Sequence, residues 1–419
     1  MQLAKSRKAL TDPYFLILCV MGAFAILSST MSKDPVLPFF ASKLNTPADL
    51  TGFIAAASTI PGILVSLPAA SLSDHFGRRK FVLLATFIFA SAPFLYLLVT
   101  AWWQLALVRF YHGFATAIFV PVAEATIAEQ FPAKKGERIS DFNAATYVGR
   151  GLAPALGGYI LLLTNQGLST PSNFATLYVA VGVSGVVAFA IALLLLRETK
   201  PMLADAPKAQ FSTRSLLRGW LEVATNKGTL VVTFVQSVQY YVFGVVEFYL
   251  VLYMQKVAGL NSFEIGIVMT VQIVSLIVSR PLMGRFSDRT SRRIPVVIGC
   301  LLSGALLFII PFISQYWVFI LISIGYGLGF AMVVSSTSPI MVEVNRDCFI
   351  GTSMGFLSTM MDIGQAIGPI ISGVILASIL SYTGLFTSLT LLLAASAVVF
   401  FVSGISKTRE KKEKAAEKH

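Results

Sequence analysis

Apolar residues occur in long runs along the whole chain, and short polar stretches separate these runs. Most runs reach about 20 residues, the length that a helix rising about 1.5 Å per residue needs to cross a bilayer core. The pattern predicts an all-α integral membrane protein whose first run is a span rather than a cleaved signal. We expect twelve transmembrane helices, at residues 14–40, 50–71, 81–100, 104–128, 141–164, 174–196, 229–255, 264–284, 294–313, 317–340, 351–377 and 383–404.

Basic residues lie mostly on one side of the predicted membrane. Of the 32 Lys and Arg residues, most fall at the N-terminus, in every second connection and in the C-terminal tail, whereas the opposite connections carry only Lys43 and Lys256. Cytoplasmic loops of membrane proteins carry the excess of positive charge. Both termini are therefore expected in the cytoplasm and the protein in the inner (plasma) membrane. Trp102, Trp103 and Trp317 are expected as anchors at the opposite interface.

The composition narrows the classes of function. Apolar residues make up 56% of the chain and charged residues 12%, whereas a soluble domain has about 25% charged residues. The net charge of +12 follows the predicted topology and lacks the interleaved aromatic residues of a nucleic-acid surface. The three Cys and three His residues show no metal-ligand spacing. Without an ATP-binding loop or a catalytic constellation, neither an enzyme nor a cofactor is expected.

The two halves of the sequence resemble each other. Residues 72–80 match residues 286–294, and residues 149–158 match residues 364–373, in both cases at an offset of about 214 positions. A polar, basic stretch lies between the halves, with an amphipathic helix expected near residues 215–223. We therefore predict six-helix bundles at 1–197 and 229–405, a cytoplasmic linker at 198–228 and a charged cytoplasmic tail at 406–419.

The connection after the second predicted span carries a recognisable motif, LSDHFGRRK at residues 72–80. It resembles the signature of the major facilitator superfamily and departs from it at Ala70 and His75. With the repeated six-span plan, the resemblance covers the whole chain. It implies a secondary transporter built from two pseudo-symmetric bundles, a small-molecule site near the membrane midplane, and alternating access by a rocker-switch motion.

The same resemblance implies a conformational latch on the cytoplasmic side. Asp74 is expected to face the start of the eleventh span, and Arg78 to pair with an acid at the end of the fourth span, Glu129. The predicted latch comprises Asp74, Gly77, Arg78 and Glu129 with the repeat-related Asp288, Arg292 and Glu343. The alternative is that Arg78 and its basic neighbours only set the topology.

The fifth predicted span contains small residues at regular spacing around a proline. It resembles the antiporter signature of the superfamily, which implies proton-driven efflux, and its repeat lies in the eleventh span. Small residues let helix backbones approach closely and proline bends the helix, so helix packing alone is the alternative. The motif residues are Gly149, Pro154, Gly157, Gly158, Gly364, Gly368, Pro369 and Gly373.

Two acidic residues occupy matching positions in the first and seventh spans. Asp34 and Glu247 each precede a Lys at the outer edge, Lys43 or Lys256, by nine residues, which corresponds to a depth of about 13 Å. A carboxylate there can exchange a proton or attract a cationic substrate. The alternative for Asp34 is that the first span stops near Met31, which would leave Asp34 outside the membrane.

Other polar residues inside spans are weaker candidates for coupling or substrate binding. The motif RFYHG at residues 109–113 resembles a superfamily pattern that implies a proton-coupling role for Arg109, and snorkelling to the interface is the alternative. Arg150 and Asp362 are expected to balance each other's charge or to face the cytoplasmic opening. The remaining candidates, for which packing is the alternative role, are His112 as a proton relay and Tyr240 and Gln236 as pocket-lining residues.

Together these patterns predict a proton-coupled antiporter that exports small amphipathic or cationic drug-like compounds. Its expected partners are protons, a small-molecule substrate and the lipid bilayer, the proton gradient supplies its energy, and it is expected to act as a monomer. One alternative is a proton symporter or facilitator for an organic anion, a sugar or another metabolite, which Arg109 and Arg150 would support. A non-transporting receptor is a third possibility.

Overall fold

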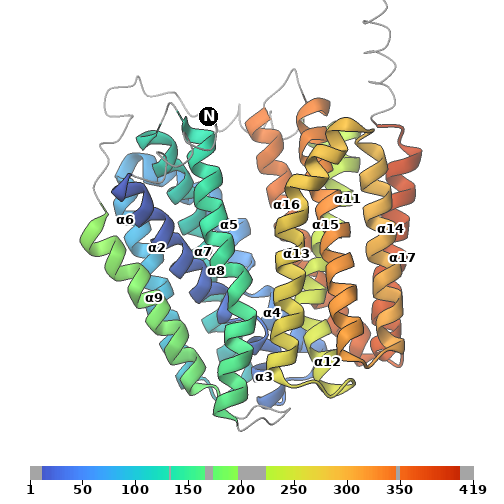
Figure 1. Cartoon of the computed structure of the whole chain (residues 1–419), viewed down its shortest axis with the longest axis horizontal. Coiled ribbons are helices and arrows are strands. Elements are labelled where there is room, and N and C mark those ends of the chain that lie inside the picture. The colour runs from blue at the N-terminus through green and yellow to red at the C-terminus, as the bar shows by residue number, and fades with distance from the viewer. Residues whose placement is uncertain (1–11, 132–133, 166–172, 197–222, 346–349, 406–419) are drawn as a thin grey trace, which may run out of the picture. The chain divides into compact units, whose positions relative to one another are not determined.

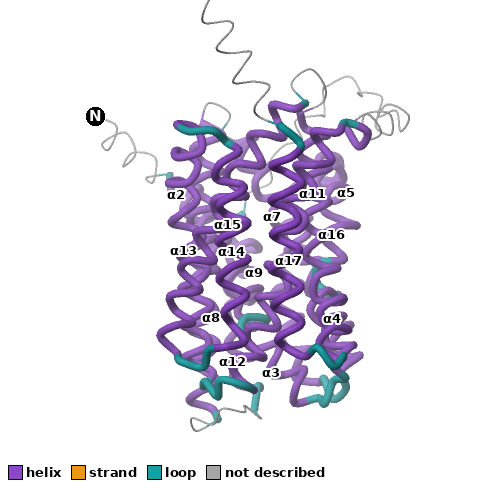
Figure 2. The backbone as a smooth tube through the Cα atoms, turned by 90° about the vertical axis from the view of Figure 1, so that its right-hand side faces the viewer, coloured by secondary structure: helices purple, strands orange, loops and turns teal. Residues whose placement is uncertain are grey.

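The computed structural model describes residues 12–131, 134–165, 173–196, 223–345 and 350–405. In these residues the chain is helical and contains no strand (Figures 1 and 2). The first half contains α2 (Pro13–Met31), α3 (Val36–Lys43), α4 (Ala48–Ala56), α5 (Ile60–Phe76), α6 (Arg78–Leu95), the short η1 (Tyr96–Leu98), α7 (Trp102–Gln130), α8 (Lys135–Thr164) and α9 (Ala175–Leu195).

The second half repeats this plan. It contains α11 (Lys227–Val245), the π-helical turn η3 (Val246–Leu250), α12 (Val251–Lys256), α13 (Ser262–Arg289), α14 (Arg293–Ile309), η4 (Ile310–Phe312), α15 (Tyr316–Val344), α16 (Ile350–Ala377) and α17 (Ser381–Val402). The predicted spans therefore end within two helical turns of the observed helices, and the predicted all-α membrane fold is confirmed. The amphipathic helix expected near residues 215–223 and the charged tail lie almost wholly outside the described residues.

Eleven helical segments among the described residues are long and apolar enough to cross a membrane. The predicted span at 141–164 is not among them, although it lies within α8, a continuous helix of 30 residues. Polar residues such as Asn143, Thr146 and Arg150 lower the hydropathy of α8. The length of α8 still suffices for a span, because about 20 helical residues cover the bilayer core.

Contacts divide the chain into two compact units. Unit 1 comprises residues Met1–Thr46, Phe53–Ala209 and Leu260–Thr270, and unit 2 comprises Pro47–Gly52, Gln210–Gly259 and Val271–His419. Each unit thus contains most of one half of the sequence and a short segment from the other half. The linker predicted at 198–228 falls mostly on residues outside the described ranges.

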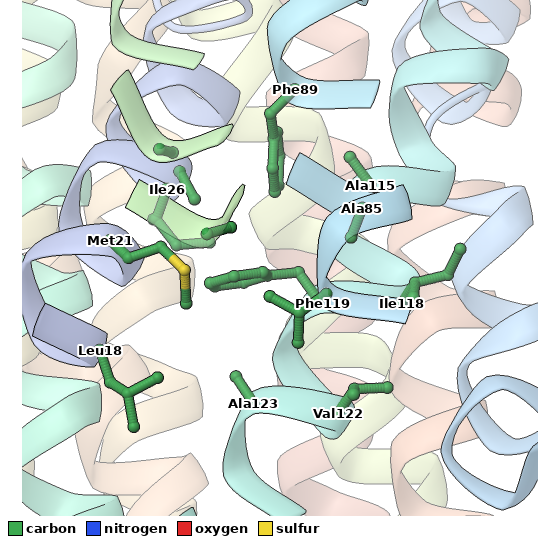
Figure 3. Close-up of a cluster of buried hydrophobic side chains, with 14 of the residues drawn as sticks. Leu18, Met21, Ile26, Ala85, Phe89, Ala115, Ile118, Phe119, Val122 and Ala123 are labelled. Carbon is green, nitrogen blue, oxygen red and sulfur yellow. The ribbon is translucent and has the colours of Figure 1, made fainter. Parts of the chain in front are cut away.

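The apolar core of unit 1 lies where α2, α6 and α7 meet. Phe89 and Phe119 pack edge to face with ring centroids 5.8 Å apart, and Phe119 projects toward Met21 (Figure 3). In unit 2 the corresponding core contains Val235, Cys300 and Phe400 among its buried residues. Apolar side chains also cover the outside of many helices, which is the pattern of helices surrounded by lipid.

Glycine residues allow two helix pairs to pack closely. A Cβ atom at Gly149 of α8 would overlap the Ala23 carbonyl of α2, and one at Gly364 of α16 would overlap the Ser237 carbonyl of α11. The signatures in the fifth and eleventh spans therefore let α8 approach α2 and α16 approach α11 closely, and the efflux role that the resemblance implies stays a prediction.

The first and seventh spans are both interrupted at related positions. α2 ends at Met31 and α3 begins at Val36, with Asp34 in the turn between them, whereas the seventh span stays helical but widens into the π-helical η3 that contains Glu247. Turns of this kind inside helices often mark functional positions. The two matching acids thus lie at the irregular part of each span.

Candidate functional site

Asp34 is buried in unit 1 and lies close to a lysine. Its side chain is 4% exposed, and Oδ2 lies 3.5 Å from Nζ of Lys33. α2 ends at Met31, as the alternative interpretation of the sequence requires, but the chain continues into α3, whose Leu37 and Phe39 are buried. Asp34 therefore occupies a packed protein environment rather than an exposed loop.

Glu247 lies on η3 in unit 2 and is held by the eleventh span. Nε2 of Gln365 on α16 donates a hydrogen bond to Oε2 of Glu247 at 3.3 Å. The carboxylate also lies close enough to Tyr326 of α15 for an electrostatic interaction. Gln365 can reach Glu247 because Gly244 leaves room between the helices: a Cβ there would lie 2.7 Å from the Gln365 carbonyl oxygen.

An aromatic cluster lies on the same helix face as Glu247. Tyr240 and Phe243 of α11 lie three residues apart and Glu247 follows four residues later, so all three share one helix face. Phe330 of α15 completes the cluster, with ring centroids 5.2 Å from Tyr240 and 4.9 Å from Phe243. Phe330 is fully buried, whereas Tyr240 and Phe243 are only partly buried, so Phe330 supports the two rings that retain accessible surface.

A second hydrogen bond ties η3 to α16. The buried hydroxyl of Tyr249 donates to the Pro369 carbonyl at 3.0 Å, and the Tyr249 and Thr51 hydroxyl oxygens are 3.2 Å apart. Tyr249 follows Glu247 by two residues, and Pro369 follows Gln365 by four, which is one helical turn. Two side-chain hydrogen bonds therefore fix the π-helical turn against the proline-containing segment of α16.

Gln236, predicted to line a pocket, is fully buried among helices of unit 2. Its Oε1 accepts a hydrogen bond from Thr337 Oγ1 at 2.5 Å, and its Nε2 donates to Sδ of Met361 at 2.8 Å. Both ends of the amide are thus engaged with α15 and α16. Gln236 stabilises the packing of these helices, whereas Tyr240 lies in the aromatic cluster.

Arg109 and His112 lie together in the buried part of unit 1. Arg109 is 3% exposed, which excludes snorkelling to the interface, and its Nη2 donates to Ser58 Oγ at 2.5 Å. His112 is 2% exposed, and its Nδ1 lies 3.5 Å from Ser32 Oγ and 3.4 Å from the Tyr96 hydroxyl. Asp34 and Arg109 form no ion pair with each other among the described residues.

Arg150 and Asp362 lie at less enclosed positions. Arg150 of α8 is exposed, and Asp362 of α16 is partly buried. Among the described residues of its own unit, each lacks an ion-pair partner. Their expected mutual charge balance stays a prediction.

The charged residues of the predicted latch form the expected pairs within each unit. In unit 1, Arg78 donates to Oε1 of Glu129 through Nε at 3.0 Å and Nη2 at 2.6 Å. In unit 2, Arg292 pairs with Glu343 and with Asp288, the latter at 3.2 Å. Gly77, with a φ of 98°, forms the junction between α5 and α6, a conformation that favours glycine.

The Asp74 side chain, the remaining member of the predicted latch, lies outside the described residues. The function of these ion pairs as a latch stays a prediction.

Four residues of the Glu247 region were absent from the sequence-based prediction: Phe243, Tyr249, Phe330 and Gln365. Phe243 could have been found, because it lies one turn from both Tyr240 and Glu247 on the same helix face. The other three depend on how η3, α15 and α16 pack, which periodicity along one helix does not specify.

Known proteins resemble this chain along its length. A family model described as the Major Facilitator Superfamily matches residues 14–343 and 232–419. Quinolone resistance protein NorA from Staphylococcus aureus is 23% identical over 345 residues, which cover 81% of this chain and 84% of that protein. Multidrug resistance protein 2 from Bacillus subtilis is 22% identical over 389 residues, which cover 91% and 92%.

Solved structures resemble the fold as well. A bacterial homologue of the human lysosomal transporter Spinster matches with a TM-score of 0.76 at 15% identity, covering 94% of this chain and 98% of that one.

Proposed function

Because this chain belongs to the major facilitator superfamily, we propose that it is a proton-coupled antiporter that exports small amphipathic, preferentially cationic compounds. Membership of this family, together with its transporter relatives, makes the protein a multi-pass membrane transporter of small molecules and not an enzyme. The direction of transport, the coupling ion and the substrate class are the parts that we propose.

The observation that carries the proposal is the position of Glu247 on the same helix face as two partly accessible aromatic rings. An aromatic face attracts a cation that approaches within about 6 Å of the ring centroid, and a carboxylate adds a full negative charge. Tyr240 and Phe243 present partly accessible rings on the same helix face as Glu247. This combination favours a lipophilic cation over a sugar, which would need several hydrogen-bonding groups.

The relatives support export as the direction of transport. Two of them, NorA and multidrug resistance protein 2, carry names that denote resistance to quinolones and to multiple drugs. The antiporter-like signature at Gly149–Gly158 points the same way. At identities near 22%, these relatives support a class of function rather than a particular compound.

The coupling scheme follows from competition at a carboxylate. Ionised Glu247 attracts the cation, and a proton that binds Glu247 removes the negative charge and favours release. Asp34, the matching acid of unit 1, is the second candidate for the exchanged proton. The proton gradient supplies the energy, and both termini face the cytoplasm in this scheme, in accord with the one-sided distribution of Lys and Arg.

The alternative is proton symport or facilitated transport of an organic anion or another metabolite. The observation that favours it is the buried Arg109 of unit 1, a cation that an anionic group of a substrate would neutralise. In that case Glu247 would bind the transported proton, and Arg109 would bind the anionic substrate.

The test uses the purified chain in liposomes that contain a pH-sensitive dye. With an acidic interior, the lipophilic cation tetraphenylphosphonium is expected to release protons from the vesicles, and Glu247→Gln is expected to abolish this release. Glu137→Gln, which changes an exposed acid paired with Lys134, is the matched control and is expected to retain it. Proton release at the wild-type rate in Glu247→Gln combined with Asp34→Asn would refute the coupling scheme. Proton movement with benzoate or a sugar instead would establish the alternative.

A further inference from the structure

Arg109 places a full positive charge in the buried part of unit 1. Its guanidinium stays protonated under all physiological conditions, and the residue is 3% exposed in the first third of the hydrophobic helix α7. A buried charge is stable only when it is paired or well hydrogen-bonded. Its hydrogen bond to Ser58 Oγ leaves most of its five N–H groups for other partners, and Nε has no hydrogen-bond partner among the described residues.

The acids of unit 1 that the structure describes do not neutralise Arg109. None of their carboxylates lies within 4.0 Å of its guanidinium, the limit for an ion pair. The acids of the neighbouring helices bind elsewhere: Asp34 to Lys33, Glu124 to Asn143 and Glu129 to Arg78. No carboxylate in the described part of unit 1 therefore pairs directly with Arg109.

Further hydrogen-bond donors surround the guanidinium. The rings of Tyr96 and Tyr178 stack in parallel with centroids 4.4 Å apart, and both interact electrostatically with Arg109. The Tyr178 hydroxyl and Nε2 of His112 lack hydrogen-bond partners among the described residues, although both side chains are at least 98% buried. The Tyr96 hydroxyl faces Nδ1 of His112, so a guanidinium with the Tyr178 hydroxyl and the Nε2–H of His112 remains as a donor set suited to an anion.

The second half of the chain has no arginine at the position that corresponds to Arg109, so the fold itself does not require one there. At the offset of 214 positions, Arg109 and Ser58 correspond to Ser323 and Gln272, which are neutral. The helix contact beside them is similar in both units. A Cβ at Gly113 would overlap the Ser58 carbonyl, and one at Gly327 would lie 2.8 Å from the Gln272 carbonyl oxygen. Packing of the two helices therefore needs a small residue but not an arginine.

We propose that unit 1 binds a small monovalent anion at Arg109, with Ser58, Tyr178 and His112 as further donors. The anion is either a free halide or the carboxylate of a bound solute, because both present one negative charge and accept several hydrogen bonds. This site is separate from the carboxylate of Glu247, and the proposal does not depend on proton coupling.

The test measures the thermal unfolding midpoint of the purified full-length chain in detergent at constant ionic strength. Sodium sulfate is the reference salt, and chloride, acetate and benzoate are titrated in turn. If the anion binds with a Kd of about 1 mM, replacing sulfate by about 100 mM chloride is expected to raise Tm by about 3 °C or more. A rise with chloride identifies a halide site, and a rise with the carboxylates alone identifies the carboxylate of a solute. If neither raises Tm, the proposal is overturned.

Variants locate the effect. Arg109→Gln is expected to abolish the anion-dependent rise in Tm, whereas Lys80→Gln, which removes an exposed cation of the same unit, retains it. If Arg109→Gln does not fold, Tyr178→Phe is used instead, because loss of one hydroxyl donor is expected to lower the affinity for the anion about tenfold. A full response in Arg109→Gln, or in its absence an unchanged anion affinity in Tyr178→Phe, would overturn the assignment.

Discussion

Phe243 offers the sharpest test of the aromatic cluster beside Glu247. The substitution Phe243→Leu keeps most of the apolar volume but removes the negatively polarised ring face that attracts a cation. The ring is partly buried and lies 4.9 Å from Phe330 and 6.2 Å from Tyr240, so it contributes to a surface rather than filling the core. The expected loss is the cation–π part of binding, about 0.5–2 kcal/mol, which weakens Kd about 2- to 30-fold.

Equilibrium binding of tetraphenylphosphonium to the purified protein measures this loss, and a neutral compound of similar shape serves as the second probe. The affinity for the neutral compound is expected to fall by less than about twofold, because Leu keeps the apolar contact that Phe makes. Phe308→Leu, which changes an exposed ring of α14, is the matched control and should leave both affinities unchanged. Equal losses for the cation and the neutral compound would show that Phe243 acts through packing alone, and no loss for either would place the substrate elsewhere.

Three further predictions concern the packing and the ion pairs. Tyr249→Phe removes a side-chain hydrogen bond to the Pro369 carbonyl and is expected to cost about 0.5–1.5 kcal/mol of unfolding free energy, measured as a lower Tm; an unchanged Tm would contradict this. Arg78→Gln and Glu129→Gln are each expected to slow transport, and the double variant should be no slower than the slower single variant, whereas additive effects would argue against a shared role. Gly149→Val forces a side chain against the backbone of α2 and is expected to cost about 1–3 kcal/mol, while Gly136→Val, with open space around it, should cost much less.

The helices and their order could be predicted from the sequence because the bilayer imposes one length and one polarity on every span. The apolar run at 141–164 predicts α8 as well, although α8 is less apolar than the other spans. The pairing of Arg78 with Glu129 was implied by the resemblance to the superfamily, and the same pair recurs in unit 2 as Arg292 and Glu343.

Contacts between helices were harder to predict, because an apolar helix looks similar on every face. Nothing in the pattern of α16 distinguishes Gln365 from its neighbours as the partner of Glu247. The π-helical turn that contains Glu247 has no sequence signal that we recognise. In the same way, Gln236 is a polar residue of the kind that lines pockets. Only its observed hydrogen bonds to Thr337 and Met361 show that it joins helices.

The repeat also separates shared features of the two units from those that differ. Arg79 donates to a carbonyl near the end of α9, and Arg293, at the offset of 214, donates to one at the end of α17, so both units keep this contact.

Asp12 and Asn226, at the same offset, cap α2 and α11. Deeper in the spans the chemistry diverges, with Arg109 in one unit and Ser323 at the corresponding position in the other. Contacts that both units need for folding or movement are expected to persist in both copies, whereas recognition of a solute and an ion needs two different sites. The divergent interior positions are therefore where the specificity of this transporter should be sought.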